Sequence, residues 1–307
     1  MSSKQRVVIV GGGIMGADIA AIFAAGGHAV DIVQRSGARR DTLAQRFTRA
    51  LAQLGAGPAV PVVRESLREV SWHGVGIVVE SVRENLTLKQ RLFAELDTLA
   101  PVEVILASNS SSFPISKIAA GLHTRQRMLN LHFFMPAHVV PLVEIVKSEA
   151  TDPQLAARVF DLMTSLGRKP VMVAKDIPGF LANRIQHAMM REAWSLIERG
   201  IASAEDVDTA VRFGFGFRFI AAGPILQKEL SGLDVHLDAS TAMYPDLCND
   251  TAPIASLKNK VAAGDLGMKS GKGFYAWTPE KAAAVRRDYD SALEKGLEIL
   301  KASNDSR

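Results

Sequence analysis

A histidine and a glutamate in neighbouring apolar runs have the residue types needed for acid–base chemistry. His132 lies in LHFF and Glu144 in PLVEIV, and residues 136–138 between the two runs favour a turn. Paired as a hairpin, the two strands could bring the imidazole and the carboxylate together. An imidazole gains and loses a proton near neutral pH, and a carboxylate on its other nitrogen fixes the tautomer and stabilises the imidazolium. The pattern therefore predicts an acid–base dyad; the alternative is a core histidine with a structural hydrogen bond.

A glycine-rich segment near the N-terminus has the spacing of a phosphate-binding turn. It follows the strand-like run RVVIV and precedes an Ala-rich helix pattern and a second strand-like run, HAVDIV. In G-x-G-x-x-G, the first glycine allows a tight turn, the second lets the backbone approach a pyrophosphate, and the third lets helix and strand pack closely. The helix N-terminus adds unpaired N–H groups. In this context the motif predicts a dinucleotide site rather than a turn without a ligand, with five predicted contact residues: Gly11, Gly13, Ile14, Met15 and Gly16.

The end of the second strand bears on which dinucleotide binds. An acidic residue there would bind a ribose 2′-hydroxyl, but the strand ends with neutral Gln34 followed by Arg35, and Asp31 lies too early in the strand. A neutral residue removes a repulsive charge, and the guanidinium offers a partner to a 2′-phosphate. The pair therefore favours NADP; the alternative is a solvated Arg35 in an enzyme that uses NAD.

Strand and helix patterns alternate through the first part of the chain and then give way to helices alone. The alternation over residues 1–178 predicts a mostly parallel sheet with helices on both faces, an α/β fold of the Rossmann type. From Gly179 onward helical patterns dominate, so we expect an all-α domain over residues 179–307. The first domain would bind the dinucleotide, and the second would bind substrate and form a homodimer.

The bulk properties of the chain narrow the class of protein. With 307 residues, a net charge of +4 and no long basic tract, the chain is not expected to bind nucleic acid. The single cysteine, Cys248, cannot form an intrachain disulfide or a cysteine-rich metal site, and we expect no metal. The N-terminus lacks the apolar core of a signal peptide, and no apolar stretch reaches the roughly 20 residues of a membrane span. We therefore expect a cytoplasmic protein with no membrane partner.

Six stretches taken together resemble the L-3-hydroxyacyl-CoA dehydrogenase superfamily along almost the whole chain. They are VVIVGGGIMGADIA, VVESVRENLTLKQRLFAELD, ASNSSSFPISKIA, LHFFMPAHVVPLVEIV, DIPGFLANRI and LGMKSGKGFYAW. The sequence resembles most the branch that includes L-gulonate 3-dehydrogenase (lambda-crystallin) and L-carnitine dehydrogenase. This resemblance implies an NAD-dependent enzyme that removes a hydride and a proton from a CH–OH group of a small molecule.

The resemblance also assigns roles to individual residues. His132 matches the general acid/base that takes the hydroxyl proton, and Glu144 matches the residue that holds its imidazole. Ser111 matches a serine that hydrogen-bonds the substrate oxygen, and Asn183 an asparagine that helps to position substrate and histidine. Without the resemblance, Ser111 could simply cap the next helix and Asn183 could bond to backbone at the start of its helix.

Two further residues and three departures from the family pattern follow from the same resemblance. Glu84 and Lys89 resemble a pair near the nicotinamide ribose, although they could be an ordinary helix-surface pair. Met135 replaces the asparagine of the usual HFFNP, and a thioether barely accepts a hydrogen bond. The long helical arm that faces CoA in acyl-CoA enzymes is cut back here, because the helix is predicted to end near Gly55. Gln34 replaces the usual strand-end aspartate.

Arg218 bears on the substrate class. It lies in FGFGFRFIAAGP, a predicted loop that is shorter in acyl-CoA enzymes and lacks the arginine there, whereas the gulonate and carnitine enzymes resemble this sequence. A guanidinium can hold a carboxylate by two parallel hydrogen bonds. A free 3-hydroxy acid has a carboxylate and a thioester does not. The alternative is a salt bridge at a surface or an interface.

These observations predict an NAD(P)-dependent dehydrogenase that oxidises the 3-hydroxyl of an L-3-hydroxy acid with a free carboxylate. The alternative enzyme is an L-3-hydroxyacyl-CoA dehydrogenase acting on CoA thioesters. A dinucleotide-binding sensor or a structural protein is the alternative outside catalysis, but neither needs a proton acceptor such as His132.

Overall fold

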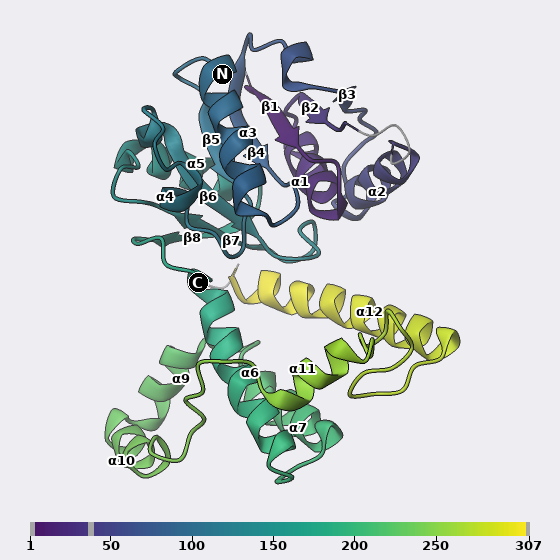
Figure 1. Ribbon diagram of the computed structural model, residues 1–307, viewed down its shortest axis with the longest axis vertical. Helices are drawn as coiled ribbons and strands as arrows, with labels where there is room; N and C mark the ends of the chain where they lie inside the picture. The colour runs from purple at the N-terminus through teal and green to yellow at the C-terminus, as the bar shows by residue number, and fades with distance from the viewer. Residues whose placement is uncertain (1–3, 36–39, 305–307) are drawn as a thin grey trace. The chain divides into compact units, whose positions relative to one another are not determined.

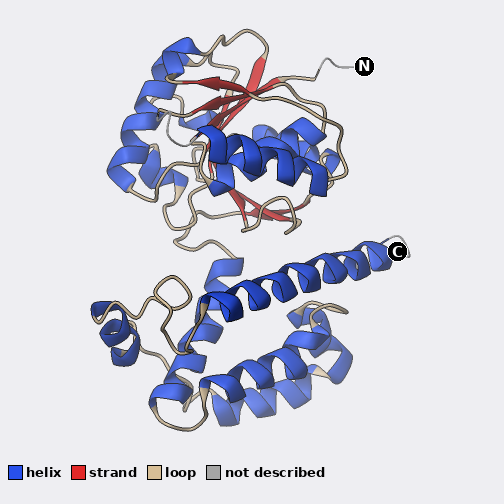
Figure 2. Cartoon of the chain, turned by 90° about the vertical axis from the view of Figure 1, so that its right-hand side faces the viewer, coloured by secondary structure: helices blue, strands red, loops and turns tan. Residues whose placement is uncertain are grey.

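The structure is a computed structural model that describes residues 4–35 and 40–304. The chain divides into two compact units, residues 1–184 and 185–307. The first unit contains the β-sheet, and the second is built from helices (Figures 1 and 2). The predicted fold class, a Rossmann-type domain followed by an all-α domain, is confirmed.

The sheet has eight strands in the order β3-β2-β1-β4-β5-β6-β7-β8. Neighbouring strands are parallel except β6 and β7, which form an antiparallel hairpin. Because β1 lies between β2 and β4, the chain reverses its direction of progress across the sheet there, and such a point opens a crevice at the carboxyl ends of the strands. The strands are β1 (Arg6–Val10), β2 (Val30–Val33), β3 (Val62–Arg64), β4 (Val75–Glu80), β5 (Ile105–Ser108), β6 (Met128–Phe133), β7 (Leu142–Val146) and β8 (Lys169–Val173).

The two faces of the sheet are each buried by helices, which explains the nearly continuous apolar strands. In β1, Val7 and Ile9 pack in one hydrophobic cluster and Val8 and Val10 in the other, because successive side chains of a strand point to opposite faces. Three helices cover the first face, α1 (Ile14–Ala25), α2 (Arg40–Gln53) and α5 (Pro153–Ser165). Two cover the second, α3 (Leu86–Leu99) and α4 (Ile115–Ile118).

The helix boundaries follow local chemistry that the sequence already carries. Asn85 accepts the N–H of Leu88 at the start of α3, and Asp152 accepts the N–H of Gln154 at the start of α5. Helix α2 ends at Gln53 and is followed by Gly55 with φ +70°, so the predicted early end of this helix is confirmed. Strand β3 was not predicted, because it is a three-residue edge strand without a buried side chain.

The second unit consists of helices joined by turns. They are α6 (Ala182–Glu198), which begins in the first unit, α7 (Ala204–Ala210), the π-helix η4 (Val211–Phe215), α8 (Gly216–Arg218), α9 (Pro224–Ser231), α10 (Leu233–Met243), α11 (Ala255–Ala262) and α12 (Pro279–Asn304). Within the described part of the chain, none of the helices has both the length and the apolar character needed to cross a membrane.

The predicted loop around Arg218 is wrong, because this segment is helical. Arg218 ends α8, directly after the π-helix. The rings of Phe215 and Phe219 meet edge to face with centroids 5.8 Å apart, and an aromatic pair four residues apart stabilises a helical turn. Within the π-helix, Gly214 departs from helical dihedral angles.

Candidate active site

The glycine turn after β1 has the geometry that a phosphate-binding turn requires. Gly11 has φ +108°, and a Cβ atom there would lie 2.6 Å from the carbonyl oxygen of Ser81. A Cβ on Gly16 would lie 1.8 Å from the carbonyl oxygen of Gly11, so only glycine lets α1 pack this closely on the turn. A Cβ on Gly13 would meet nothing within 4 Å. The backbone of Gly13 is therefore open to a ligand, while its two partner glycines shape the turn.

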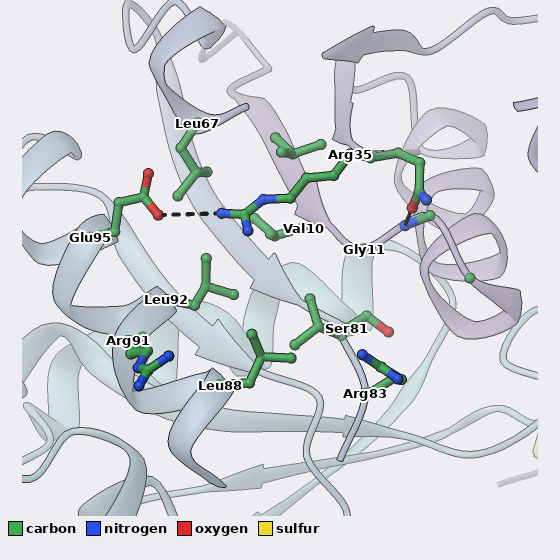
Figure 3. A pocket seen from close by; sticks show the side chains of 15 residues that line it. Val10, Gly11, Arg35, Leu67, Ser81, Arg83, Leu88, Arg91, Leu92 and Glu95 are labelled. Atoms are coloured by element: carbon green, nitrogen blue, oxygen red, sulfur yellow. Dashed lines mark hydrogen bonds and ion pairs between the residues drawn. The ribbon is translucent and has the colours of Figure 1, made fainter. Parts of the chain in front are cut away.

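A cavity of about 540 Å³ lies beside this turn, at the carboxyl ends of β1, β2 and β4 (Figure 3). The predicted residues Gly11, Gly13, Gln34 and Arg35 line it, together with residues of α3. The Gln34 side-chain oxygen accepts the N–H of Gly12 at 2.8 Å, which ties the strand end to the turn. Five other predicted cofactor residues do not line this cavity: Ile14, Met15, Gly16, Glu84 and Lys89.

His132 and Glu144 meet across the β6–β7 hairpin, so the predicted contact between the imidazole and the carboxylate is present. His132 and Glu144 are directly opposite each other in the strand register. The imidazole Nδ1 lies 2.8 Å from Oε2 of the carboxylate, and the residues are 4% and 0% exposed. An ionised carboxylate only accepts hydrogen bonds, so Nδ1 carries the proton. In the neutral ring Nε2 is then left as the proton acceptor.

The other oxygen of Glu144 is held by backbone. Oε1 accepts the N–H groups of Leu181 at 3.2 Å and Ala182 at 2.7 Å, where α6 begins. Unpaired N–H groups at a helix start stabilise a negative charge. Phe180, just before them, has φ +50°, a left-handed conformation that is strained for a residue with a side chain. Its buried ring packs edge-on against His132 with centroids 5.6 Å apart. The turn that places the two N–H groups therefore also contacts the imidazole.

The loop that carries Ser111 is fixed on both sides of that residue. Oε1 of Glu84 accepts the hydroxyl of Ser110 at 2.5 Å and the N–H of Ser112 at 3.0 Å. Ser111 itself is half-buried, and no hydrogen bond of its hydroxyl to another described residue is found. The loop is also tied to the strand of the histidine, because Asn109 accepts the N–H of Phe133 at 2.9 Å. The hydroxyl of Ser111 is thus held in place by its neighbours.

Lys89 lies in a buried charge network under this loop. Its ammonium is 2.7 Å from Glu80 and 3.3 Å from Glu84, and Lys89 and Glu80 are 1% and 0% exposed. Oε2 of Glu80 accepts the hydroxyl of Ser108 at 2.6 Å, and Oε1 accepts the N–H of Val82 at 2.7 Å. Glu84 and Lys89 therefore form an ion pair. Lys89 is buried, so the pair does not lie on the helix surface.

The same network fixes the ionisation of Glu84. Burial raises the pKa of its carboxyl, but the hydrogen bond from Ser110 and the charge of Lys89 outweigh burial, so the pKa is lowered from its ordinary value. The ionised carboxylate is therefore favoured by folding. This contribution to stability is present at neutral pH and is lost as the pH falls through the lowered pKa of Glu84.

Asn183 and Met135 occupy the remaining predicted positions. Asn183 is the second residue of α6 and directly follows Ala182, which binds Glu144. Met135, which replaces the family asparagine, is 63% exposed. Arg218 is exposed on the second unit and forms no ion pair with any described residue.

Sequence reasoning missed three residues of the buried network: Glu80, Ser108 and Ser110. A signal for Glu80 was present, because it is an acidic residue at the carboxyl end of the apolar strand VGIVVE. Nothing in the spacing of the serines distinguishes Ser110, whose hydroxyl bonds Glu84, from Ser111, whose hydroxyl bonds no described residue.

Comparison with known proteins fixes the family. The model described as "3-hydroxyacyl-CoA dehydrogenase, NAD binding domain" matches residues 6–177, and that described as "3-hydroxyacyl-CoA dehydrogenase, C-terminal domain" matches residues 179–277. The chain belongs to the 3-hydroxyacyl-CoA dehydrogenase family. Members of this family pair an NAD-binding domain with the same C-terminal domain, so the chain is an NAD-dependent oxidoreductase that acts on CH–OH groups.

Two similar family members differ in the substrates they are named for. The 5-formyl-3-hydroxy-2-methylpyridine 4-carboxylate 5-dehydrogenase of Mesorhizobium japonicum is 34% identical over 306 residues, covering 96% of this chain and 98% of the relative. The mitochondrial hydroxyacyl-coenzyme A dehydrogenase of Rattus norvegicus is 36% identical over 292 residues, covering 89% and 91%. The family thus includes both a pyridine carboxylate dehydrogenase and CoA-ester enzymes.

Solved structures show the same division. The crystal structure of a 5-formyl-3-hydroxy-2-methylpyridine 4-carboxylic acid 5-dehydrogenase, described as an NAD⁺-dependent dismutase, has a TM-score of 0.90 at 32% identity and covers 97% of this chain and 99% of its own. The (S)-3-hydroxybutyryl-CoA dehydrogenase of Ralstonia eutropha has a TM-score of 0.72 at 31% identity and covers 90% and 100%. The backbone of this chain is therefore more like that of the pyridine carboxylate enzyme.

Replacing Lys89 with methionine should strongly destabilise the protein. The change leaves the carboxylate of Glu80 buried without its cation, which typically costs about 3–5 kcal/mol. Urea unfolding at neutral pH measures the loss. Lys117→Met removes the same charge from an exposed site and should change the free energy of unfolding by less than about 0.5 kcal/mol. Equal unfolding midpoints for Lys89→Met and wild type would contradict the buried ion pair.

Proposed function

We propose that the chain oxidises the CH–OH group of a small substrate with a free carboxylate, an L-3-hydroxy acid of the gulonate or carnitine kind, with His132 as the base. The observation that carries this proposal is the dyad. A buried imidazole whose Nδ1 is held at 2.8 Å by Glu144 has one nitrogen left for a substrate proton. It lies on β6 of the sheet whose parallel strands β1 and β4 carry the dinucleotide cavity.

The proposal gives each residue a role in the reaction. When bound, NAD⁺ accepts the hydride that leaves the carbinol carbon. Nε2 of His132 takes the hydroxyl proton, and the fixed charge of Glu144 stabilises the imidazolium that forms. The hydroxyl of Ser111 hydrogen-bonds the substrate oxygen from its fixed loop, and the Asn183 amide positions substrate beside the histidine. These roles carry over from the family resemblance, and the hydrogen bonds around Glu84 and Glu144 support them.

Two observations favour a free acid over a CoA thioester. Helix α2 ends at Gln53 and residues 54–61 lead directly to β3, so the first unit lacks an extended arm of the kind that faces CoA in acyl-CoA enzymes. The TM-score is 0.90 with the pyridine carboxylate dehydrogenase, whose name contains a carboxylate and no coenzyme A, and 0.72 with the 3-hydroxybutyryl-CoA enzyme.

CoA thioesters remain the alternative substrates. The family itself is named for them, and 3-hydroxyadipyl-CoA dehydrogenase of Escherichia coli is 33% identical over 322 residues, covering 99% of this chain. The Arg218 experiment below decides between the two substrate classes.

We also propose a homodimer formed through the second unit. Among the described residues of this unit, the buried hydrophobic ones are Ala193 and Ile254. Large hydrophobic side chains such as Phe213, Leu230 and Leu237 are exposed. Large exposed apolar surface is typical of a protein interface. A second copy of the chain would bury it.

NAD is the cofactor that the family indicates, and use of NADP stays a prediction from the strand end. Neutral Gln34 places no negative charge beside a ribose 2′-phosphate, and the Arg35 guanidinium borders the cavity. Both features are compatible with NADP as a second cofactor.

Changing His132 to glutamine should lower kcat by about 10²–10⁴-fold, because the step loses its general base. The affinity for NAD⁺ should stay the same. Glu144→Gln should also lower kcat, because the imidazole loses its orientation and its counter-charge. NADH formation with L-gulonate, L-carnitine and L-3-hydroxybutyrate measures the effect, with the exposed His123→Gln as the control. Near-normal turnover by His132→Gln would remove this histidine from the mechanism.

Changing Arg218 to methionine should raise KM for a free acid and lower kcat/KM about ten- to hundredfold. A lost charge-assisted hydrogen bond commonly costs about 1.5–3 kcal/mol. Lysine at this position should restore only part of the activity, because an ammonium lacks the two-point geometry of a guanidinium. Arg212→Met removes the same charge from the same segment and should have little effect.

The comparison is made on L-3-hydroxybutyrate and on L-3-hydroxybutyryl-CoA. Arg218→Met should not affect the thioester rate. If wild type prefers the thioester and Arg218→Met leaves both rates unchanged, the free-acid proposal is wrong and the acyl-CoA alternative replaces it.

A further inference from the structure

The dinucleotide cavity has an apolar wall and a charged rim. The wall consists of side chains from β1, β2, a 3-10 helix at residues 67–69, the loop after β4, and α3: Val10, Val33, Leu67, Val82, Leu88 and Leu92. Three arginines border the same cavity, Arg35, Arg83 and Arg91. Among the residues that line it, Glu95 is the one with an acidic side chain. An apolar wall of this kind suits the flat adenine ring, and the arginines suit phosphates.

Glu95 faces the arginine that the sequence offers to a 2′-phosphate. Nη2 of Arg35 lies 3.8 Å from Oε2 of Glu95. Arg35 follows β2 and Glu95 belongs to α3, and Figure 3 shows the arginine side chain extended across the cavity toward the glutamate. The ion pair therefore joins the two sides of the cavity. The Arg35 side chain is 78% exposed, so its guanidinium is able to turn to another anion.

The residue at the end of β2 does not itself select between NAD and NADP. Gln34 is neutral, and its side-chain oxygen is already bonded to the N–H of Gly12 at 2.8 Å. A strand-end carboxylate normally repels a 2′-phosphate and accepts the 2′-hydroxyl. No such carboxylate stands at this strand end, so discrimination between NAD and NADP would need another charged group at the cavity.

We propose that Glu95 is a specificity-determining residue that directs the site toward NAD by holding Arg35. A 2′-phosphate has to compete with the carboxylate of Glu95 for the guanidinium, whereas a 2′-hydroxyl does not. Glu95 on helix α3 thus has the function that a strand-end acid has in other dinucleotide sites. This inference rests on the dinucleotide site and not on the proposed substrate.

The test is the affinity of the protein for NAD⁺ and for NADP⁺, which differ only by the 2′-phosphate, measured by isothermal titration calorimetry without substrate. Glu95→Gln should tighten NADP⁺ about three- to tenfold, in keeping with a partly exposed ion pair, and change NAD⁺ less than about twofold. Glu103→Gln is the matched control, because it removes the same charge from an exposed position that does not line the cavity. It should change neither affinity.

The double variant Arg35→Met/Glu95→Gln tests whether Glu95 acts through Arg35. It should lose the gain in NADP⁺ affinity. If Glu95→Gln leaves the ratio of the two affinities unchanged, Glu95 does not determine specificity. If the gain survives in the double variant, Glu95 does not act by holding Arg35. Failure of the free-acid proposal would leave both binding results untouched.

Discussion

The carboxylate of Glu144 is the point on which the candidate active site depends. One oxygen holds Nδ1 of His132 at 2.8 Å, and the other accepts the N–H groups of Leu181 and Ala182. A fully buried carboxylate is costly unless its lone pairs are satisfied, and here the hairpin supplies one partner and the start of α6 supplies the others. One carboxylate therefore ties together the hairpin, the start of α6 and the imidazole of His132. Phe180, which directly precedes these N–H groups, has a left-handed backbone conformation.

Glu80, another buried carboxylate of the sheet, follows the same physical rule. Glu80 is satisfied by Lys89, Ser108 and the N–H of Val82, and the connected Glu84 holds the loop on both sides of Ser111. Both carboxylates lie in central strands, where apolar neighbours exclude water and strengthen each hydrogen bond. The site therefore consists of rigid supports around a few open groups. Those open groups are the hydroxyl of Ser111, Nε2 of His132 and the backbone at Gly13.

Much of this arrangement could be predicted from the sequence, because side-chain periodicity and glycine spacing report on strands and turns directly. One example is the hairpin in which His132 and Glu144 lie opposite each other. Other features could not be predicted. The N–H groups that bind Glu144 carry no side-chain signal, and the left-handed residue before them is a phenylalanine rather than a glycine. The sequence shows Glu80 as an acidic strand end but does not show that Lys89, on helix α3, pairs with it. The helical form of the Arg218 segment was also missed.

The tautomer of His132 tests the central claim most directly. Nitrogen-15 NMR of protein with labelled histidine, recorded on the neutral imidazole, distinguishes a protonated nitrogen from a bare one. The geometry of Glu144 predicts a proton on Nδ1 and none on Nε2, and Glu144→Gln should remove this preference. A neutral His132 with its proton on Nε2 in the wild-type protein would contradict the account, because no nitrogen would then be free to accept a proton from substrate.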